Sequence, residues 1–195
     1  MVYAAKRCAR QLRKLRDGPR NAGHGYRLTC GQWSTRSKAQ KLPRSGSDEC
    51  DADVGAAADK GCGANAIGDT GGLTQYGAYL QTLAPGATSS NRHWHEREDE
   101  FLYVVSGEVT IVEEDGRHVL GPGDAACWPA GVPNAHCVVN ASQAPCSYLI
   151  VGTRLTHDVC HYPDSGRTLH TEGETWRMVD ADGLELRSGR VEPEW

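Results

Sequence analysis

The stretch EVTIVEEDGRHVLGPGD, residues 108–124, has the pattern of two short β-strands joined by a tight turn and stopped by a second turn. The residues before the Asp115-Gly116 dipeptide are rich in Val, Ile and Thr. Both residues of the dipeptide tolerate positive φ, so the dipeptide favours a hairpin. A Gly-Pro-Gly run at residues 121–123 then breaks the chain sharply. The stretch therefore predicts antiparallel β-structure.

Short runs of the same kind surround this hairpin and alternate with turn signals. The runs are LTQYGAYLQTL, EFLYVV, EVTIVEE, RHVL, DAACW, AHCVVN and CSYLIVGTR. Strands this short at this spacing are typical of an antiparallel sandwich or small barrel. No segment of residues 73–155 has helical periodicity, and we find no internal repeat. The chain is therefore expected to be all-β, with one barrel.

The charge is distributed very unevenly along the chain. Residues 1–44 carry 12 Lys and Arg against one acid, Asp17, for a net charge of +11, whereas residues 45–195 have a net charge of −15. Neither the basic segment nor the Gly-, Ala- and Asp-rich segment after it can bury enough apolar area to offset its ordering entropy. The expected division of the chain is residues 1–65 as a basic, largely disordered extension, residues 66–165 as the barrel and residues 166–195 as a C-terminal tail with a possible hairpin.

The basic extension has several interpretations. It could be an organelle transit peptide, contact nucleic acid or touch an anionic membrane surface. We favour a solvated extension without a role in the fold, and we expect no nucleic acid to bind the barrel. No apolar run approaches the length needed to cross a bilayer. The eight cysteines form no CxxC pair and no secretory signal is evident, which favours reduced thiols and a cytoplasmic protein, with organelle targeting as the alternative.

Two histidines stand two positions apart in the stretch HWHEREDEF, residues 93–101. Residues i and i+2 of a strand point to the same face, so His93 and His95 would project together and Trp94 would project away. A barrel interior normally takes apolar side chains, and two inward imidazoles there would need partners for their nitrogens. A shared metal ion would satisfy both, which predicts a metal site.

Further ligands should come from other strands. Glu100 opens the strand that follows the acidic run and is the acid best placed to enter the barrel mouth, whereas Glu96, Glu98 and Asp99 are expected to be solvated. His136 begins an apolar strand after a Pro/Gly turn. One carboxylate with imidazoles suits Fe, Mn, Ni, Co or Zn as a divalent ion.

The spacing of these residues resembles two motifs of the cupin superfamily. His93, His95, Glu100 and Gly107 match the first motif, and Gly123, Pro129, Gly131, His136 and Asn140 match the second in order. Gly86 stands one residue farther from His93 than the pattern expects, and the turn before His136 is two residues longer. Asn134 therefore occupies the nominal ligand position and is the alternative to His136. The chain is also similar to uncharacterised single-domain cupins that carry HWHE-x-EDE and a terminal VGTR…YPD stretch.

The resemblance implies a double-stranded β-helix, or jelly roll, of the RmlC-like kind and a homodimer. With the ligand set His93, His95, Glu100 and His136, it implies a metal-dependent enzyme acting on a small polar molecule, as a sugar isomerase or a dioxygenase. Glu100 and Tyr103 are weak candidates for proton transfer, and Arg92 and Arg154 could attract an acidic substrate. The alternative is a non-catalytic module that binds a small ligand or a metal.

Overall fold

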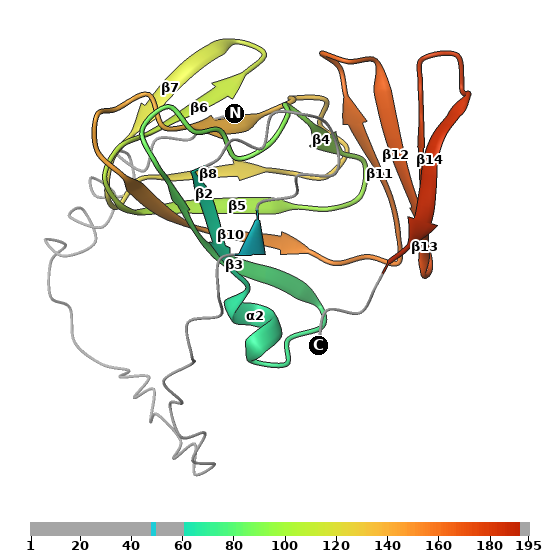
Figure 1. The fold of residues 1–195 in the computed structure, drawn as a ribbon, viewed down its shortest axis with the longest axis horizontal. Coiled ribbons are helices and arrows are strands. Elements are labelled where there is room, and N and C mark those ends of the chain that lie inside the picture. Colours follow the sequence, from blue (N-terminus) through green and yellow to red (C-terminus); the bar gives the residue numbers. More distant parts are fainter. Residues whose placement is uncertain (1–47, 50–60, 192–195) are drawn as a thin grey trace, which may run out of the picture.

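The computed structural model describes residues 48–49 and 61–191, so nearly all of the expected N-terminal extension lies outside the described residues. Within them, strands predominate and the one helix is the single turn α2 (Ile67–Thr70). The strands form three antiparallel sheets in this part of the chain. Figure 1 shows two of these sheets curled around a common interior, with the third standing beside them. The expected all-β jelly roll is confirmed.

Strand order places the two motif-bearing segments in the curled part. The six-stranded sheet contains, in order, β1 (Asp48–Glu49), β2 (Cys62–Asn65), β3 (Tyr76–Leu83), β10 (Cys146–Thr153), β5 (Glu100–Ser106) and β8 (Ala125–Trp128). The three-stranded sheet contains β7 (Gly116–Leu120), β6 (Val109–Glu113) and β9 (Cys137–Val139). β6 and β7 form the hairpin predicted at Asp115-Gly116, with Glu113 paired to Gly116.

The hydrophobic core lies between these two sheets. Period-2 alternation along β5 buries Leu102 and Val104 completely, while the residues on either side of them point outward. Val109 and Ile111 of β6 close the core from the opposite sheet, and both are fully buried. The core therefore fixes the direction of each side chain on β5, including Glu100 at its first position.

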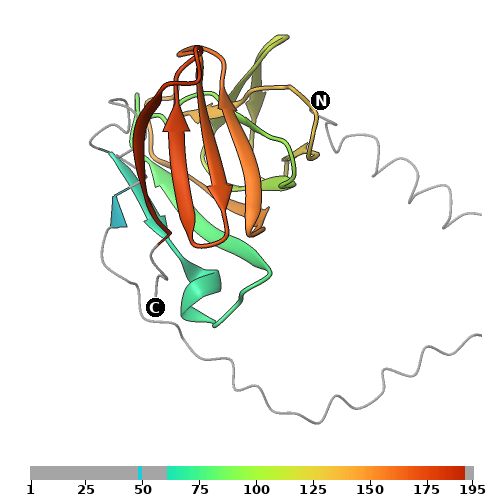
Figure 2. The same cartoon turned by 90° about the vertical axis from the view of Figure 1, so that its right-hand side faces the viewer.

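The C-terminal segment is part of the fold. The five-stranded sheet contains, in order, β14 (Glu185–Arg190), β13 (Thr175–Val179), β12 (Arg167–Glu172), β11 (His157–Tyr162) and β4 (Trp94–His95). β13 and β14 pair over the segment of the possible hairpin, and Figure 2 shows this sheet face-on. β11 pairs with both β12 and β4, so the sheet crosses the expected boundary at residue 165 and reaches the histidine motif.

The cysteines differ from one another in their chemical state. Cys127, Cys137, Cys146 and Cys160 are free thiols, as expected. Cys62 is disulfide-bonded, so the expectation of reduced thiols throughout is wrong for this residue. Cysteine spacing in a sequence does not reveal which thiols approach one another in space. The described residues include no helix with the length and apolar character required to span a membrane.

Gly107, between β5 and β6, provides a test of the barrel's turn geometry. Its φ of +73° lies in the left-handed region, and an added β-carbon would lie 2.7 Å from the Pro145 carbonyl oxygen. We expect Gly107→Ala to lower the free energy of unfolding by about 2 kcal/mol or more, because strain and a backbone clash add. Urea unfolding measures this loss.

The matched control is Gly116→Ala, in the β6–β7 turn. Gly116 also has a positive φ, of +133°, but nothing lies within 4 Å of an added β-carbon. The decrease in the free energy of unfolding of Gly116→Ala should therefore reflect backbone strain alone and be smaller than that of Gly107→Ala. Equal losses in the two variants would contradict a role for the contact at Gly107.

Candidate metal centre

The two histidine motifs meet at one point of the barrel. An isolated antiparallel bridge pairs His93 with His136, with N···O distances of 3.1 and 2.9 Å between their backbone groups. His95 follows in β4, and Glu100 begins β5, which enters the barrel next to this bridge. The bridge therefore brings together side chains that are far apart in the sequence.

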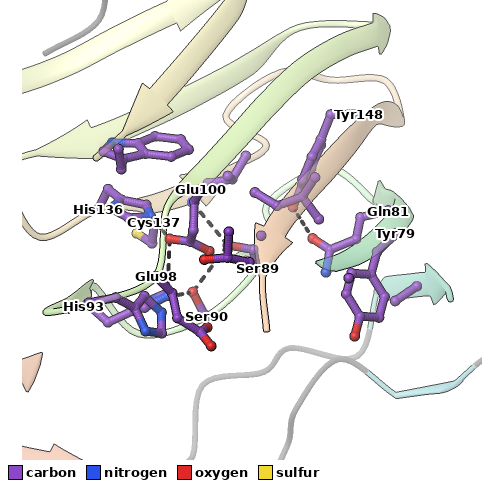
Figure 3. Close-up of a pocket in the computed structure, with 18 of the residues that line it drawn as sticks. Tyr79, Gln81, Ser89, Ser90, His93, Glu98, Glu100, His136, Cys137 and Tyr148 are labelled. Carbon is purple, nitrogen blue, oxygen red and sulfur yellow. Dashed lines mark hydrogen bonds and ion pairs between the residues drawn. The ribbon is translucent and has the colours of Figure 1, made fainter. Parts of the chain in front are cut away.

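Three of the four expected ligands form a tight cluster. The Nε2 atom of His136 lies 2.8 Å from Oε2 of Glu100, and Nε2 of His93 lies 3.9 Å from the same oxygen. Their potential ligand atoms all lie within 4.8 Å of one another. His95 lies beside this cluster, with its ring centroid 5.2 Å from that of His93 and its ring plane nearly perpendicular. Figure 3 shows His93, Glu100 and His136 converging on the cavity.

The other ring nitrogen of each histidine faces an oxygen acceptor. Nδ1 of His93 lies 2.9 Å from the Asn91 carbonyl oxygen, and Nδ1 of His136 lies 3.3 Å from the Asn134 carbonyl oxygen. Nδ1 of His95 lies 2.6 Å from Oδ2 of Asp158. Because oxygen acceptors require Nδ1 to donate, the neutral form of each ring has its lone pair on Nε2.

Electrostatics keep Glu100 ionised and His93 neutral. Burial opposes ionisation of Glu100, but the close approach of His136 and the charge interactions with the neighbouring histidines outweigh it and lower the pKa of Glu100 to about 2. Burial lowers the pKa of His93 to about 4. Burial is the largest effect on His95 and acts to lower its pKa, but the interactions with Asp158, Cys160 and Glu100 together outweigh it and raise that pKa to about 11. An anionic carboxylate thus faces imidazole nitrogens in a buried site.

These groups fit a divalent first-row metal. Oε2 of Glu100 is buried and lacks a hydrogen bond of good geometry, although Nε2 of His136 is only 2.8 Å away. A carboxylate oxygen and a nitrogen lone pair repel each other at this distance unless a cation or a proton lies between them. Imidazole and carboxylate together are a typical donor set for such ions, and an acceptor on each Nδ1 is typical of metal-binding histidines.

The cluster forms one wall of a cavity of about 440 Å³. Glu100, Gly152 and Gly77 stand side by side on β5, β10 and β3, so two positions beside the carboxylate have no side chain. Tyr79 and Arg154 lie at the far side, where Nη2 of Arg154 is 2.5 Å from the Tyr79 hydroxyl. The cavity is therefore a trough that runs from the cluster to a guanidinium group.

The structure answers the question about Asn134. Its side-chain oxygen accepts a hydrogen bond from the Glu114 backbone N–H at 3.3 Å, and it does not line the cavity. His136 lines the cavity instead and is buried. The longer turn before His136 thus places the histidine, and not Asn134, against Glu100.

Three other expectations need correction. Glu98 was expected in solvent, but it is half-buried and lines the cavity, with Oε1 accepting from the Leu155 N–H at 2.7 Å. Tyr103 lies on the outer face of β5 with 42% of its surface exposed, away from the cavity. Strand alternation already puts residues three apart on opposite faces, so the sequence contained the signal against pairing Tyr103 with Glu100. Arg92 pairs with Asp164 and Glu114 outside the cavity.

Sequence reasoning missed the contribution of β11. Asp158 accepts from His95 and also, through Oδ1, from the Arg97 backbone N–H at 2.9 Å. Cys160 on the same strand could contribute a ligand atom together with His93 and His95. No local pattern marks these residues, because only the pairing of β11 with β4 brings them to the site.

Comparisons with known proteins agree with this geometry. The family model described as "Cupin domain" matches residues 79–152. A crystal structure described as a sugar phosphate isomerase from a cupin superfamily, from Silicibacter pomeroyi, is 38% identical, with a TM-score of 0.63. The match covers 68% of this chain and 84% of that one.

A second structure, of a candidate sugar phosphate isomerase from Acidithiobacillus ferrooxidans, is 30% identical with a TM-score of 0.60. That match covers 65% of this chain and 80% of the other. No curated protein matches the chain. The motif residues, the jelly-roll fold and these relatives together show that this chain belongs to the cupin superfamily.

Proposed function

We propose that this protein is a metal-dependent isomerase of a small phosphorylated sugar. One divalent first-row ion is held by His93, His95, Glu100 and His136. The observation that carries this proposal is the buried Glu100 carboxylate, which faces the Nε2 atoms of His136 and His93 at 2.8 and 3.9 Å. The similarity to two proteins described as actual or candidate sugar phosphate isomerases supports the choice of substrate.

Each part of the cavity has a role in this reaction. A bound divalent ion would polarise the substrate carbonyl and stabilise charge on its oxygen. Glu98 is the carboxylate that lines the cavity beside the cluster, held by the Leu155 N–H, and it moves the proton between neighbouring carbons. The side-chain-free position at Gly152 leaves room for a carbon chain beside Glu100, and the Tyr79 ring and Arg154 pack over Gly77 at the end of this path.

The substrate phosphate binds at the Arg154 side of the trough. Among the described residues, Arg154 is the only Lys or Arg that lines the cavity, and the Tyr79 hydroxyl and Oδ1 of Asp69 hold its guanidinium group. Two strand spacings separate Glu100 from the Gly77 side of the trough, which is about 10 Å. That span suits an open-chain sugar monophosphate.

An isomerase assay with exchange tests this function. Metal-loaded protein is incubated in D₂O with a panel of pentose and hexose monophosphates, and NMR follows aldose–ketose conversion and deuterium incorporation next to the carbonyl. We expect both, and we expect Glu98→Gln to lower kcat by about 10²-fold or more while leaving metal content unchanged. Oxygen uptake without isomerisation would instead support a dioxygenase. Ligand-induced thermal stabilisation without turnover would support a binding module.

Asp158 should strengthen metal binding through His95. The charge-assisted hydrogen bond fixes the ring and makes its Nε2 a better donor, so we expect Asp158→Ala to weaken Zn²⁺ binding by about 10- to 100-fold. Competition with a chromophoric chelator measures the affinity. Asp164→Ala is the control, because Asp164 accepts a hydrogen bond from Arg92 and does not line the cavity. Equal affinities in the Asp158→Ala and Asp164→Ala variants would rule out this role.

We also propose that the protein is a homodimer, joined through the outer face of the six-stranded sheet. Four neighbouring strands of this sheet, β3, β10, β5 and β8, have no charged residue on their outer face. The register aligns Leu80, Leu149, Tyr103 and Ala125 in one row and Val151, Phe101 and Cys127 in the next. Ala78, at the end of the second row, is buried against α2. An uncharged apolar face of this kind suits a self-complementary interface about a two-fold axis.

Tyr103→Glu tests the dimer. A carboxylate placed at the centre of an apolar interface would face its copy across the two-fold axis and lose its hydration. We expect the variant to elute as a monomer by size-exclusion chromatography with light scattering, whereas wild type elutes as a dimer. Val119→Glu, at a 60% exposed position of β7, is the control and should remain dimeric. A monomeric wild type would contradict the proposal.

A further inference from the structure

Of the three histidines in the site, His136 has the longest hydrogen bond at Nδ1. Its Nδ1 lies 3.3 Å from a carbonyl oxygen, against 2.9 Å for His93 and 2.6 Å for His95. A hydrogen bond of that length restrains a ring poorly. Some other contact must therefore set the orientation of the His136 ring, whose Nε2 makes the closest approach to Glu100.

The contact is the indole of Trp128. Its ring stacks on the imidazole of His136 with centroids 3.8 Å apart and planes 7° from parallel. The other ring neighbour of His136, His93, is 5.1 Å away at a tilt of 40°. Trp128 is only 5% exposed and lies on the inner face of β8, so the indole forms a fixed wall along one side of His136.

A buried carboxylate holds the indole in place. Nε1 of Trp128 donates to Oε1 of Glu113 at 2.6 Å, and Glu113 is 3% exposed. Glu113 ends β6, which pairs with β9, the strand that follows His136 directly. Glu113 thus bonds Trp128, Trp128 stacks on His136, and the strand pair β6–β9 places Glu113 near His136.

The other oxygen of this carboxylate faces the hairpin. Oε2 of Glu113 lies 3.5 Å from Nε2 of His118, which also lies 2.8 Å from Oδ1 of Asp115. The Glu113 carboxylate is thus buried between the indole and the β6–β7 hairpin. Its 2.6 Å hydrogen bond with Nε1 restrains the indole that stacks on His136.

We propose that Trp128 is a positioning residue for His136 and that Glu113 acts through it to preorganise the metal centre. This inference rests on the proposed metal binding. Trp128 supplies the stacking surface that replaces a short Nδ1 hydrogen bond, and the Glu113 carboxylate fixes the indole plane. Metal affinity should depend on the Glu113–Trp128 hydrogen bond even though neither residue offers a ligand to the cluster.

Zn²⁺ affinity of full-length protein, measured by chelator competition, tests the proposal. Trp128→Phe keeps an aromatic ring but removes the N–H donor, and we expect affinity to fall about 10- to 100-fold. Glu113→Gln keeps an acceptor oxygen for the indole, so its Zn²⁺ affinity should fall much less than that of Trp128→Phe. Trp94→Phe is the matched control: Trp94 stacks on His161 at 4.3 Å and 12°, away from the cluster. An affinity of Trp128→Phe equal to that of Trp94→Phe would overturn the proposal.

A second readout uses metal-free protein and separates the two proposals. Stacking at this distance should shift the imidazole proton resonances of His136 upfield through the ring current of the indole, and Trp128→Leu should remove the shift. If wild type shows the shift but binds no Zn²⁺, the proposed function is contradicted. The same result still supports the positioning of His136 by Trp128. Absence of the shift in folded wild type would overturn the positioning role.

Discussion

Replacing His93 and His136 together by alanine is expected to reduce bound divalent metal from about one equivalent per chain to below about 0.1. The two Nε2 atoms and Oε2 of Glu100 form the tight part of the cluster, with separations of 2.8 and 3.9 Å. Without the two imidazoles, only Glu100 and His95 of the four proposed ligands remain, and this pair should not retain a divalent ion through gel filtration. Elemental analysis of tag-free protein after gel filtration measures the content.

The control removes two histidines from elsewhere. The control variant combines His157→Ala and His170→Ala. His157 lies on β11 and His170 on β12, and neither residue belongs to the cluster. This variant should keep its full metal content and the same unfolding midpoint as wild type. If the His93/His136 variant is folded and still carries one equivalent, the proposed metal site is wrong.

Asn140→Ala is expected to lower the free energy of unfolding by about 3 kcal/mol. The side chain is fully buried, and its Nδ2 donates to the carbonyl oxygens of Leu83 at 2.9 Å and Ala144 at 2.8 Å. Its Oδ1 accepts from the N–H and the hydroxyl of Ser142. Alanine leaves these buried groups short of partners and opens a cavity. Chemical unfolding followed by circular dichroism gives the difference.

Asn134→Ala is the matched control for this change. Its amide makes one 3.3 Å hydrogen bond near the surface, so the loss should stay within about 1 kcal/mol. The same control addresses the site, because Asn134 occupies the nominal ligand position of the second motif. Its replacement should leave metal content unchanged. Similar unfolding energies for the two variants would contradict a structural role for Asn140.

The strand pattern and the motif spacing made much of this protein predictable. The alternation along residues 100–104 and the turn at Asp115-Gly116 depend only on residues adjacent in the sequence, so they could be predicted from it. The same local rule placed His93 and His95 together and put Glu100 at a strand start. It also argued against Tyr103 as a partner of Glu100.

Long-range register was not predictable in the same way. Glu98 was expected in solvent because its neighbours are acidic, yet the chain turns it into the cavity, where it bonds the Leu155 N–H. Residues 166–195 were expected to form a tail with a possible hairpin because the chain turns polar after Arg154, yet they extend the sheet that contains β4. The Glu98–Leu155 contact and the pairing of β4 with β11 both join segments more than 50 residues apart.

The sequence by itself determined the all-β class, the hairpin at Asp115-Gly116 and the identity of the residues in the two motifs. Each of these follows from the periodicity of a strand or the backbone freedom of a turn, which are local properties. Only the tertiary structure decided that His136 and not Asn134 faces Glu100, that Asp158 holds His95 and that Trp128 stacks on His136. Those outcomes depend on turn length and on register between distant strands, where a shift of one residue sends a side chain to the opposite face.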